Sequence, residues 1–168
     1  DASDMQYYEL AYGQGPNPES WIKIGESQTT FTRGTSLGMW DTTGLDGLYN
    51  IRLTVVLNDN SIDSDVRQVI VDNEAPVITL SAGEPGKIYR WPDDQTIELQ
   101  ANVQDRYAVD RVEFYYNGEF VGSDTESPYG FTWEITRTGQ EVFRAEAFDA
   151  IGNQSSAEII IEVQRAGS

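Results

Sequence analysis

Oxygen-bearing side chains near three points of the sequence have the clearest capacity for chemistry. Asp72, Asn73 and Glu74 are consecutive, and Asp105 and Asp149 each follow an alternating apolar run. Calcium takes six to eight oxygen ligands from carboxylates, amides and backbone carbonyls, so these five residues have the right type for a calcium site. The alternative is that Asp105 and Asp149 accept hydrogen bonds from their own loops in Asx turns, which is the commoner role of such residues.

Exposed aromatic side chains would offer a second kind of chemistry, the stacking of sugar rings on Trp or Tyr. Trp91 lies in a turn-like segment, Tyr107 lies in the loop after Asp105, and Tyr115 points outward if its neighbour Phe114 points inward. These three residues are therefore candidate glycan-binding residues. The other three tryptophans lie in strand-like patterns, where aromatic residues usually fill the core.

The composition excludes several kinds of active site. The chain of 168 residues has no histidine and no cysteine, which removes the usual nucleophiles, the Ser-His-Asp triad and the common zinc, haem and iron-sulfur ligands. A glycosidase needs two carboxylates at a fixed separation in a cleft. The acidic residues of this sequence are scattered over outward strand positions instead, so we expect no catalytic residue and no enzyme activity.

The charge balance bears on the partners of the chain. Its 28 acidic and 11 basic residues give a net charge of −17, which opposes contact with nucleic acid and with anionic lipid. No apolar stretch is long enough to span a membrane, and the N-terminus lacks the pattern of a signal peptide. We therefore expect no nucleic acid partner, no membrane insertion and no cofactor other than calcium.

The elements that must position these residues are β-strands. In the second half of the chain, apolar and polar residues alternate in short runs, which is typical of strands with one buried face. Asn117-Gly118 predicts a type I′ hairpin. About seven strands in roughly 90 residues have the size of an Ig-like sandwich. The runs are residues 77–80, 97–103, 112–116, 129–135, 143–147 and 157–163, with one more strand beginning near Phe120.

The first half repeats this pattern less regularly. Its strand-like runs are residues 8–12, 21–24, 37–40, 49–57 and 66–71. That is fewer than a complete sandwich needs, so we expect the first domain to be incomplete at its N-terminus. Its open sheet edge would pair with another chain or with a second copy of this one.

A polar segment ending in Pro76 separates the two halves and predicts an extended connection. The expected organisation is an all-β chain of two Ig-like antiparallel sandwiches, with residues 1–72 in the first domain, 73–76 as linker, 77–164 in the second domain and 165–168 as tail. In a sandwich of this strand order, the strands before Asp105 and Asp149 finish at the end where the chain enters the domain. We therefore expect both residues to lie near Asp72, Asn73 and Glu74.

The second half resembles a bacterial Ig-like domain. The resemblance rests on four blocks, residues 99–105, 109–118, 127–133 and 145–153. Arg106 and Tyr107 depart from the pattern, because family members usually carry small residues there. The linker is also similar to the calcium-binding junction of cadherins, although its acidic run is shorter.

The first half is similar to a fibronectin III or Ig-like module, on residues 8–13, 18–24 and 45–53. Such modules accompany the bacterial one at the C-termini of cell-wall enzymes, notably class A penicillin-binding proteins. The resemblance implies an extracytoplasmic, non-catalytic spacer, scaffold or interaction module beside a cell-wall glycosyltransferase or transpeptidase. Its partners would be neighbouring domains, with cell-wall glycan or protein as further candidates. The alternative function is a carbohydrate- or peptidoglycan-binding module.

Overall fold

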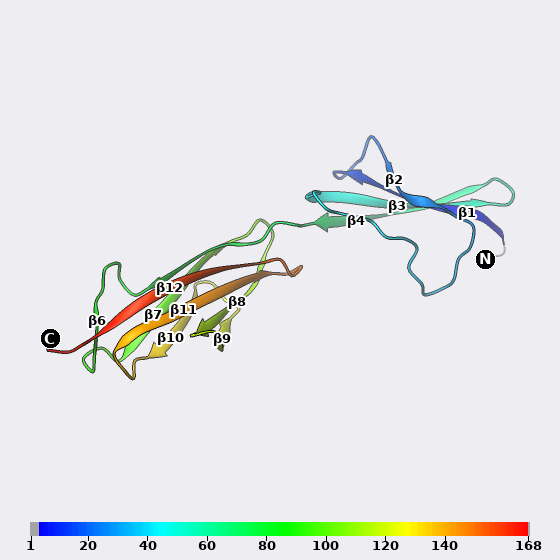
Figure 1. Cartoon of the computed structure of the whole chain (residues 1–168). Helices are drawn as coiled ribbons and strands as arrows, with labels where there is room; N and C mark the ends of the chain where they lie inside the picture. Colours follow the sequence, from blue (N-terminus) through cyan, green and yellow to red (C-terminus); the bar gives the residue numbers. More distant parts are fainter. Residues whose placement is uncertain (1–3, 168) are drawn as a thin grey trace. The chain divides into compact units, whose positions relative to one another are not determined.

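The computed structural model describes residues 4–167, and the regular elements in that range are all β-strands. The chain divides into two compact units, residues 1–73 and 74–168, and Figure 1 colours them along the sequence. The division falls inside the linker predicted at residues 73–76. The predicted all-β antiparallel fold is confirmed. Within the described range, no helix is long and apolar enough to cross a membrane.

Unit 1 contains a four-stranded sheet in the order β2-β1-β3-β4, and all of its neighbouring strands are antiparallel. The described residues of this unit therefore form one sheet, where a complete sandwich has two. The strands are β1 (Met5–Gln14), β2 (Ile22–Gln28), β3 (Gly47–Leu57) and β4 (Ile62–Val71).

The loop between β2 and β3 covers one face of this sheet. Residues 37–40, predicted as a strand, lie in the loop and form none. Trp40 packs its ring 4.7 Å from that of Tyr12, and the Tyr8 hydroxyl donates a hydrogen bond to the Leu37 carbonyl at 2.8 Å. The strand prediction was wrong because a run of four residues cannot distinguish a strand from a loop that packs two of its side chains.

Unit 2 is a two-sheet sandwich. One sheet has the order β10-β7-β5 and the other the order β6-β12-β11-β8-β9. Figure 1 shows β12 and β11 side by side. The strands are β5 (Val77–Ala82), β6 (Tyr89–Trp91), β7 (Thr96–Gln104), β8 (Val109–Tyr116), β9 (Glu119–Asp124), β10 (Tyr129–Glu134), β11 (Gly139–Asp149) and β12 (Gln154–Arg165).

The core of unit 2 lies between these two sheets. Alternation buries every second residue, so that β7 contributes Ile97 and Leu99 while Phe114 and Phe143 enter from the other sheet. The predicted hairpin between β8 and β9 is confirmed, since Asn117 and Gly118 have φ of 48° and 87°.

The short strand β6 was not predicted. It pairs in parallel with the end of β12, and Trp91, expected in a turn-like segment, is its last residue. Three residues are too few to show a period of two, so the sequence carries no signal for it.

Candidate functional site

Two of the predicted calcium ligands lie at the end of unit 2 where β5 begins. Asp105 directly follows β7, whose last residue Gln104 pairs with Val77, and Asp149 is the last residue of β11. Asp72, a third predicted ligand, belongs to unit 1 and lies in the segment that connects β4 to β5. Asp105 and Asp149, both in unit 2, each offer a carboxylate oxygen, and these two oxygens lie within 4.8 Å of each other.

Asp149 is held by the loop that follows it. Its Oδ1 accepts hydrogen bonds from the backbone N–H groups of Ile151 at 2.9 Å, Gly152 at 2.6 Å and Asn153 at 2.8 Å. Its Oδ2 accepts a hydrogen bond from the side-chain amide of Asn153 at 2.7 Å. Burial raises the pKa of Asp149, but these hydrogen bonds outweigh it and leave the pKa below its ordinary value. The loop alone therefore accounts for a buried, ionised carboxylate.

Asp105 makes a similar, smaller turn. Its Oδ1 accepts hydrogen bonds from the backbone N–H groups of Tyr107 at 2.8 Å and Ala108 at 3.1 Å. The Asx turns that the sequence offered as the alternative to calcium are thus confirmed at both residues. A bound cation would have to share oxygens that these turns already use. This competition is stronger at Asp149, where both oxygens accept hydrogen bonds, than at Asp105, where the turn uses Oδ1.

The other two predicted ligands have different surroundings. Asn73 is exposed, and its side-chain amide donates hydrogen bonds of 2.8 Å to the carbonyls of Thr42 and Leu45 within unit 1. Glu74 is exposed and lines a shallow hollow with Asp105. The oxygens of Asn73 and Glu74 are of the type that calcium binds, but the close group of carboxylates does not include Glu74.

The candidate glycan-binding residues do not lie in one row. Trp91 is 38% exposed and Tyr107 is 37% exposed. Trp91 pairs with Arg165 at the C-terminal end of β12, whereas Tyr107 lies two residues before Val109, which pairs with Asp149. Because the 12 residues of β12 separate these two ends of unit 2, at ~3.3 Å per residue the two rings are tens of ångströms apart.

Tyr115 lies on the outer face of the five-stranded sheet, and its polar edge is already engaged. Its hydroxyl donates a hydrogen bond to Glu113 at 2.6 Å, and the Arg144 guanidinium lies 4.6 Å from the centre of its ring. The hydrogen bond to Glu113, followed by burial, raises the pKa of Tyr115 to about 12. A sugar that stacks on this ring would have to displace Arg144.

A buried acidic residue was missed by sequence reasoning. Glu141 is only 3% exposed and accepts hydrogen bonds from the Arg137 side chain, at 3.0 Å, and from the Tyr116 hydroxyl. A signal was present, because alternation along β11 places Glu141 on the same face as the buried Phe143. The ion pair keeps this charge satisfied inside the sandwich and indicates a structural role.

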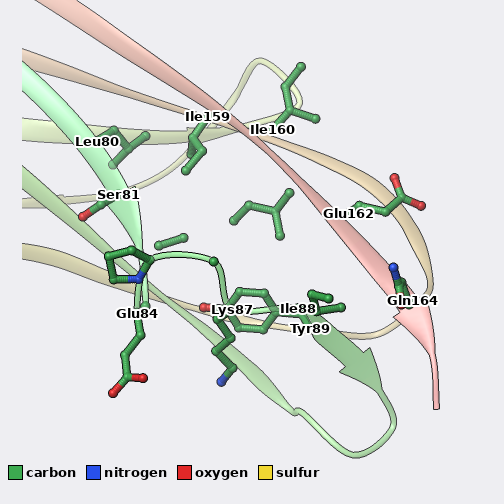
Figure 2. A pocket seen from close by; sticks show the side chains of 15 residues that line it. Leu80, Ser81, Glu84, Lys87, Ile88, Tyr89, Ile159, Ile160, Glu162 and Gln164 are labelled. Atoms are coloured by element: carbon green, nitrogen blue, oxygen red, sulfur yellow. The ribbon is translucent and has the colours of Figure 1, made fainter. Parts of the chain in front are cut away.

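An open hollow of about 400 Å³ lies beside β5 and β12 in unit 2. Figure 2 shows the residues that line it, with Leu80 and Ile159 among the apolar ones and Lys87 and Glu84 among the charged ones. Lys87 is paired with Asp94 at 3.2 Å. The lysine of this hollow is therefore already paired, and the remaining polar lining comes from residues such as Ser81, Glu162 and Gln164 (Figure 2).

Comparison with known proteins places the second half of the chain near one family. Residues 76–145 match the family model described as the bacterial Ig domain. No curated protein matches the sequence. The resemblance of the second half to a bacterial Ig-like domain, inferred from its four sequence blocks, is therefore supported.

Solved structures with a similar arrangement of strands include the fibronectin(III)-like modules of Clostridium thermocellum CbhA. They are 21% identical, with 98% of this chain and 83% of that chain covered and a TM-score of 0.46. The PKD1 domain of Vibrio anguillarum Epp is 18% identical, with coverage of 56% and 99% and a TM-score of 0.42. Murine CEACAM1b is 11% identical, with coverage of 95% and 86% and a TM-score of 0.45.

Proposed function

We propose that this chain is a non-catalytic pair of Ig-like modules that spaces or displays neighbouring domains of an extracytoplasmic bacterial protein. The observation that carries the proposal is the match of residues 76–145 to the bacterial Ig domain, combined with a sandwich interior filled by apolar side chains such as Phe114 and Phe143. A filled interior supports a role that depends on the fold itself. The finer prediction, an appendage of a class A penicillin-binding protein, rests on the resemblance of residues 8–53 alone, and the gene that encodes the whole protein tests it.

A replacement experiment tests the spacer role. The segment is exchanged, in the whole protein, for two unrelated Ig-like modules with a similar number of residues, and surface exposure and activity of the neighbouring domains are measured. A spacer tolerates this exchange and fails when the segment is deleted. Loss of function after the exchange would contradict the spacer role and favour specific binding.

Binding to cell-wall glycan is the competing function, and a pull-down on insoluble peptidoglycan separates the two. The unmutated protein is compared with Trp91→Ala and Tyr107→Ala, with Phe31→Ala as the control because Phe31 is an exposed aromatic residue of unit 1 outside the predicted set. The spacer proposal expects no retention of any of them. Retention that Trp91→Ala or Tyr107→Ala abolishes, and that Phe31→Ala leaves intact, would establish the glycan-binding module instead.

Calcium binding by Asp72, Asn73, Glu74, Asp105 and Asp149 stays a prediction, favoured by the close carboxylate oxygens of Asp105 and Asp149 within unit 2. Binding to the folded state alone raises stability by about 2.7 kcal/mol at a calcium concentration of 100 times Kd. The melting temperature of the protein should therefore rise in millimolar calcium relative to chelator. Asp105→Asn should remove this rise and Asp93→Asn, an exposed acid at the other end of unit 2, should keep it. A melting temperature that calcium does not change would exclude the site.

A further inference from the structure

The outer strand of unit 1 has a long free edge. β4 is the last strand of the sheet order β2-β1-β3-β4, and most of its residues are exposed. Figure 1 shows it beside β3. A strand of ten residues in this position presents a row of outward backbone groups that no described strand pairs, which is a template for pairing with another strand. One of these groups, the Ser64 N–H, donates a hydrogen bond to the Asp63 side chain at 2.9 Å.

The register of β3 and β4 shows which backbone groups face outward. Leu57 donates its N–H to the Ser61 carbonyl, so these two residues form a hydrogen-bonded pair, and every second pair after it repeats this geometry. The odd-numbered residues of β4 therefore bond to β3. The N–H and C=O groups of the even-numbered residues point to the free edge, from Ile62 to Ile70.

The side chains of β4 alternate in the same way between two faces of the sheet. The even-numbered face carries an apolar row, with Ile62 70%, Val66 45% and Ile70 53% exposed. The odd-numbered face carries charges, and Arg67 contacts Asp65 at 2.9 Å through an exposed ion pair. The apolar row is symmetric about Val66, and in the other row Asp65 and Arg67 stand on either side of Val66 with opposite charges.

We propose that β4 pairs antiparallel with β4 of a second copy of this chain, with Val66 opposite Val66. In this register the outward N–H and C=O groups of the even-numbered residues meet one another. Ile62 lies opposite Ile70 of the other copy, which extends the apolar row across the interface, and Asp65 lies opposite Arg67. Cross-strand pairs of this kind each contribute roughly 0.2–1 kcal/mol.

The charges of Asp65 and Arg67 favour this register over the two that are centred on those residues. Centring the pair on Asp65 would place Asp65 opposite its own copy, and centring it on Arg67 would place two arginines opposite each other. Like charges directly opposite one another destabilise a strand pair. The charged residues of β4 therefore disfavour these two registers, and only the register centred on Val66 places Asp65 opposite Arg67. The inference concerns assembly and is independent of the proposed spacer function.

Charge exchange tests the interface in the whole chain. Sedimentation velocity from micromolar to several hundred micromolar protein, at about 0.15 M salt where repulsion between distant charges is screened, should show a concentration-dependent dimer. Asp65→Arg and Arg67→Glu each place like charges opposite each other twice per dimer and should weaken dimerisation about 10-fold. The double variant D65R/R67E restores opposite charges, keeps the net charge, and should recover dimerisation to within about 3-fold.

The controls separate the interface from general effects of charge or misfolding. Glu26→Arg, an exposed residue of β2, changes the net charge as much as Asp65→Arg and should leave the dimer unchanged. Val66→Lys should abolish the dimer, and circular dichroism should show that every variant keeps its strands. A monomer at all concentrations, or a double variant that dimerises no better than the single ones, would overturn the proposal.

Discussion

At the scale of single residues, Asp149 shows how one carboxylate can close a loop. Its two oxygens accept four hydrogen bonds from residues 151–153, and it is 3% exposed. Hydrogen bonds to a buried charged acceptor are worth more than neutral ones, and removal of the acceptor leaves several donors without a partner. The loop between β11 and β12 therefore depends on this residue whether or not a cation binds nearby.

Asp149→Ala should lower the free energy of unfolding of unit 2 by about 2–3 kcal/mol, because three backbone N–H groups lose their acceptor. Asp105→Ala, which removes an acceptor from two N–H groups in a less buried turn, should have the smaller effect. Urea unfolding at pH 7 in chelator measures both. Equal losses in the two variants would contradict this explanation.

The effect of Asp149 should also depend on pH. Because the folded-state pKa lies below the ordinary value of 3.8, the unfolded chain binds the proton more tightly, and stability falls as the pH falls. The contribution is complete above about pH 5 and is lost as the pH passes down through the folded-state pKa. The difference in unfolding free energy between the unmutated protein and Asp149→Ala should shrink between pH 6 and about pH 2.5. A difference that does not change with pH would show that the carboxylate charge is unimportant.

Sequence reasoning identified Asp105 and Asp149 because loop acids directly after alternating runs have a fixed place in a sandwich of known strand order. It could not decide between Asx turns and calcium, because both use the same oxygens. It also missed Glu141, whose charge made it look like a surface residue although its position in the alternation points inward. Its partner Arg137 is four residues away in the sequence, but Tyr116 comes from another strand, and that contact exists only after folding.

At the scale of elements, the period of two predicted most strands of unit 2. Long runs such as β7 and β12 expose and bury alternate side chains over many residues, so the pattern exceeds chance. The three-residue β6 and the loop at residues 37–40 lie below the length at which a period can be recognised. The single sheet of unit 1 also weakens the pattern, because the face that lacks a second sheet does not need to be uniformly apolar.

The hairpin between β8 and β9 offers a test at this scale. Gly118 has a φ of 87°, a conformation that costs other residues roughly 1–2 kcal/mol. Gly118→Ala should therefore destabilise unit 2 by about 1 kcal/mol, although a side chain there meets no neighbouring atom. Gly130→Ala, whose Cβ would lie 3.4 Å from the Leu99 carbonyl at an ordinary φ, is the matched control and should cost less. Thermal melting measures both, and a larger loss in the control would contradict the conformational explanation.

At the scale of the whole molecule, the two units differ in how they bury apolar surface. Unit 2 packs two sheets around a continuous core. Unit 1 packs one sheet against a loop, and a hollow of about 420 Å³ lined by Tyr8, Phe31 and Leu53 remains between them. Apolar burial is the main source of stability, so we expect unit 1 to be the less stable part.

Calorimetry of the whole chain should therefore show two transitions. A fragment of residues 74–168 should fold alone and reproduce the higher of the two melting temperatures, because its core is formed entirely within the unit. Substitution of Phe114 by Ala should lower the upper transition and leave the lower one in place. Three results together would show that the units do not fold separately: a single transition in the whole chain, no transition in the fragment, and no transition in the variant with Ala at position 114.

The way the chain enters and leaves unit 2 has a mechanical consequence. Val77 begins β5 at the end of the sandwich marked by Asp105, and Arg165 finishes β12 at the end marked by Trp91. Tension transmitted through the backbone would thus pull both strands along their own axes. The six residue pairs between β5 and β7 and the ten between β11 and β12 would each bear the load together, in shear, instead of opening one after another. Because rupture then requires many hydrogen bonds to break at once, this sandwich should withstand stretching forces that would peel apart a sheet loaded from a single corner.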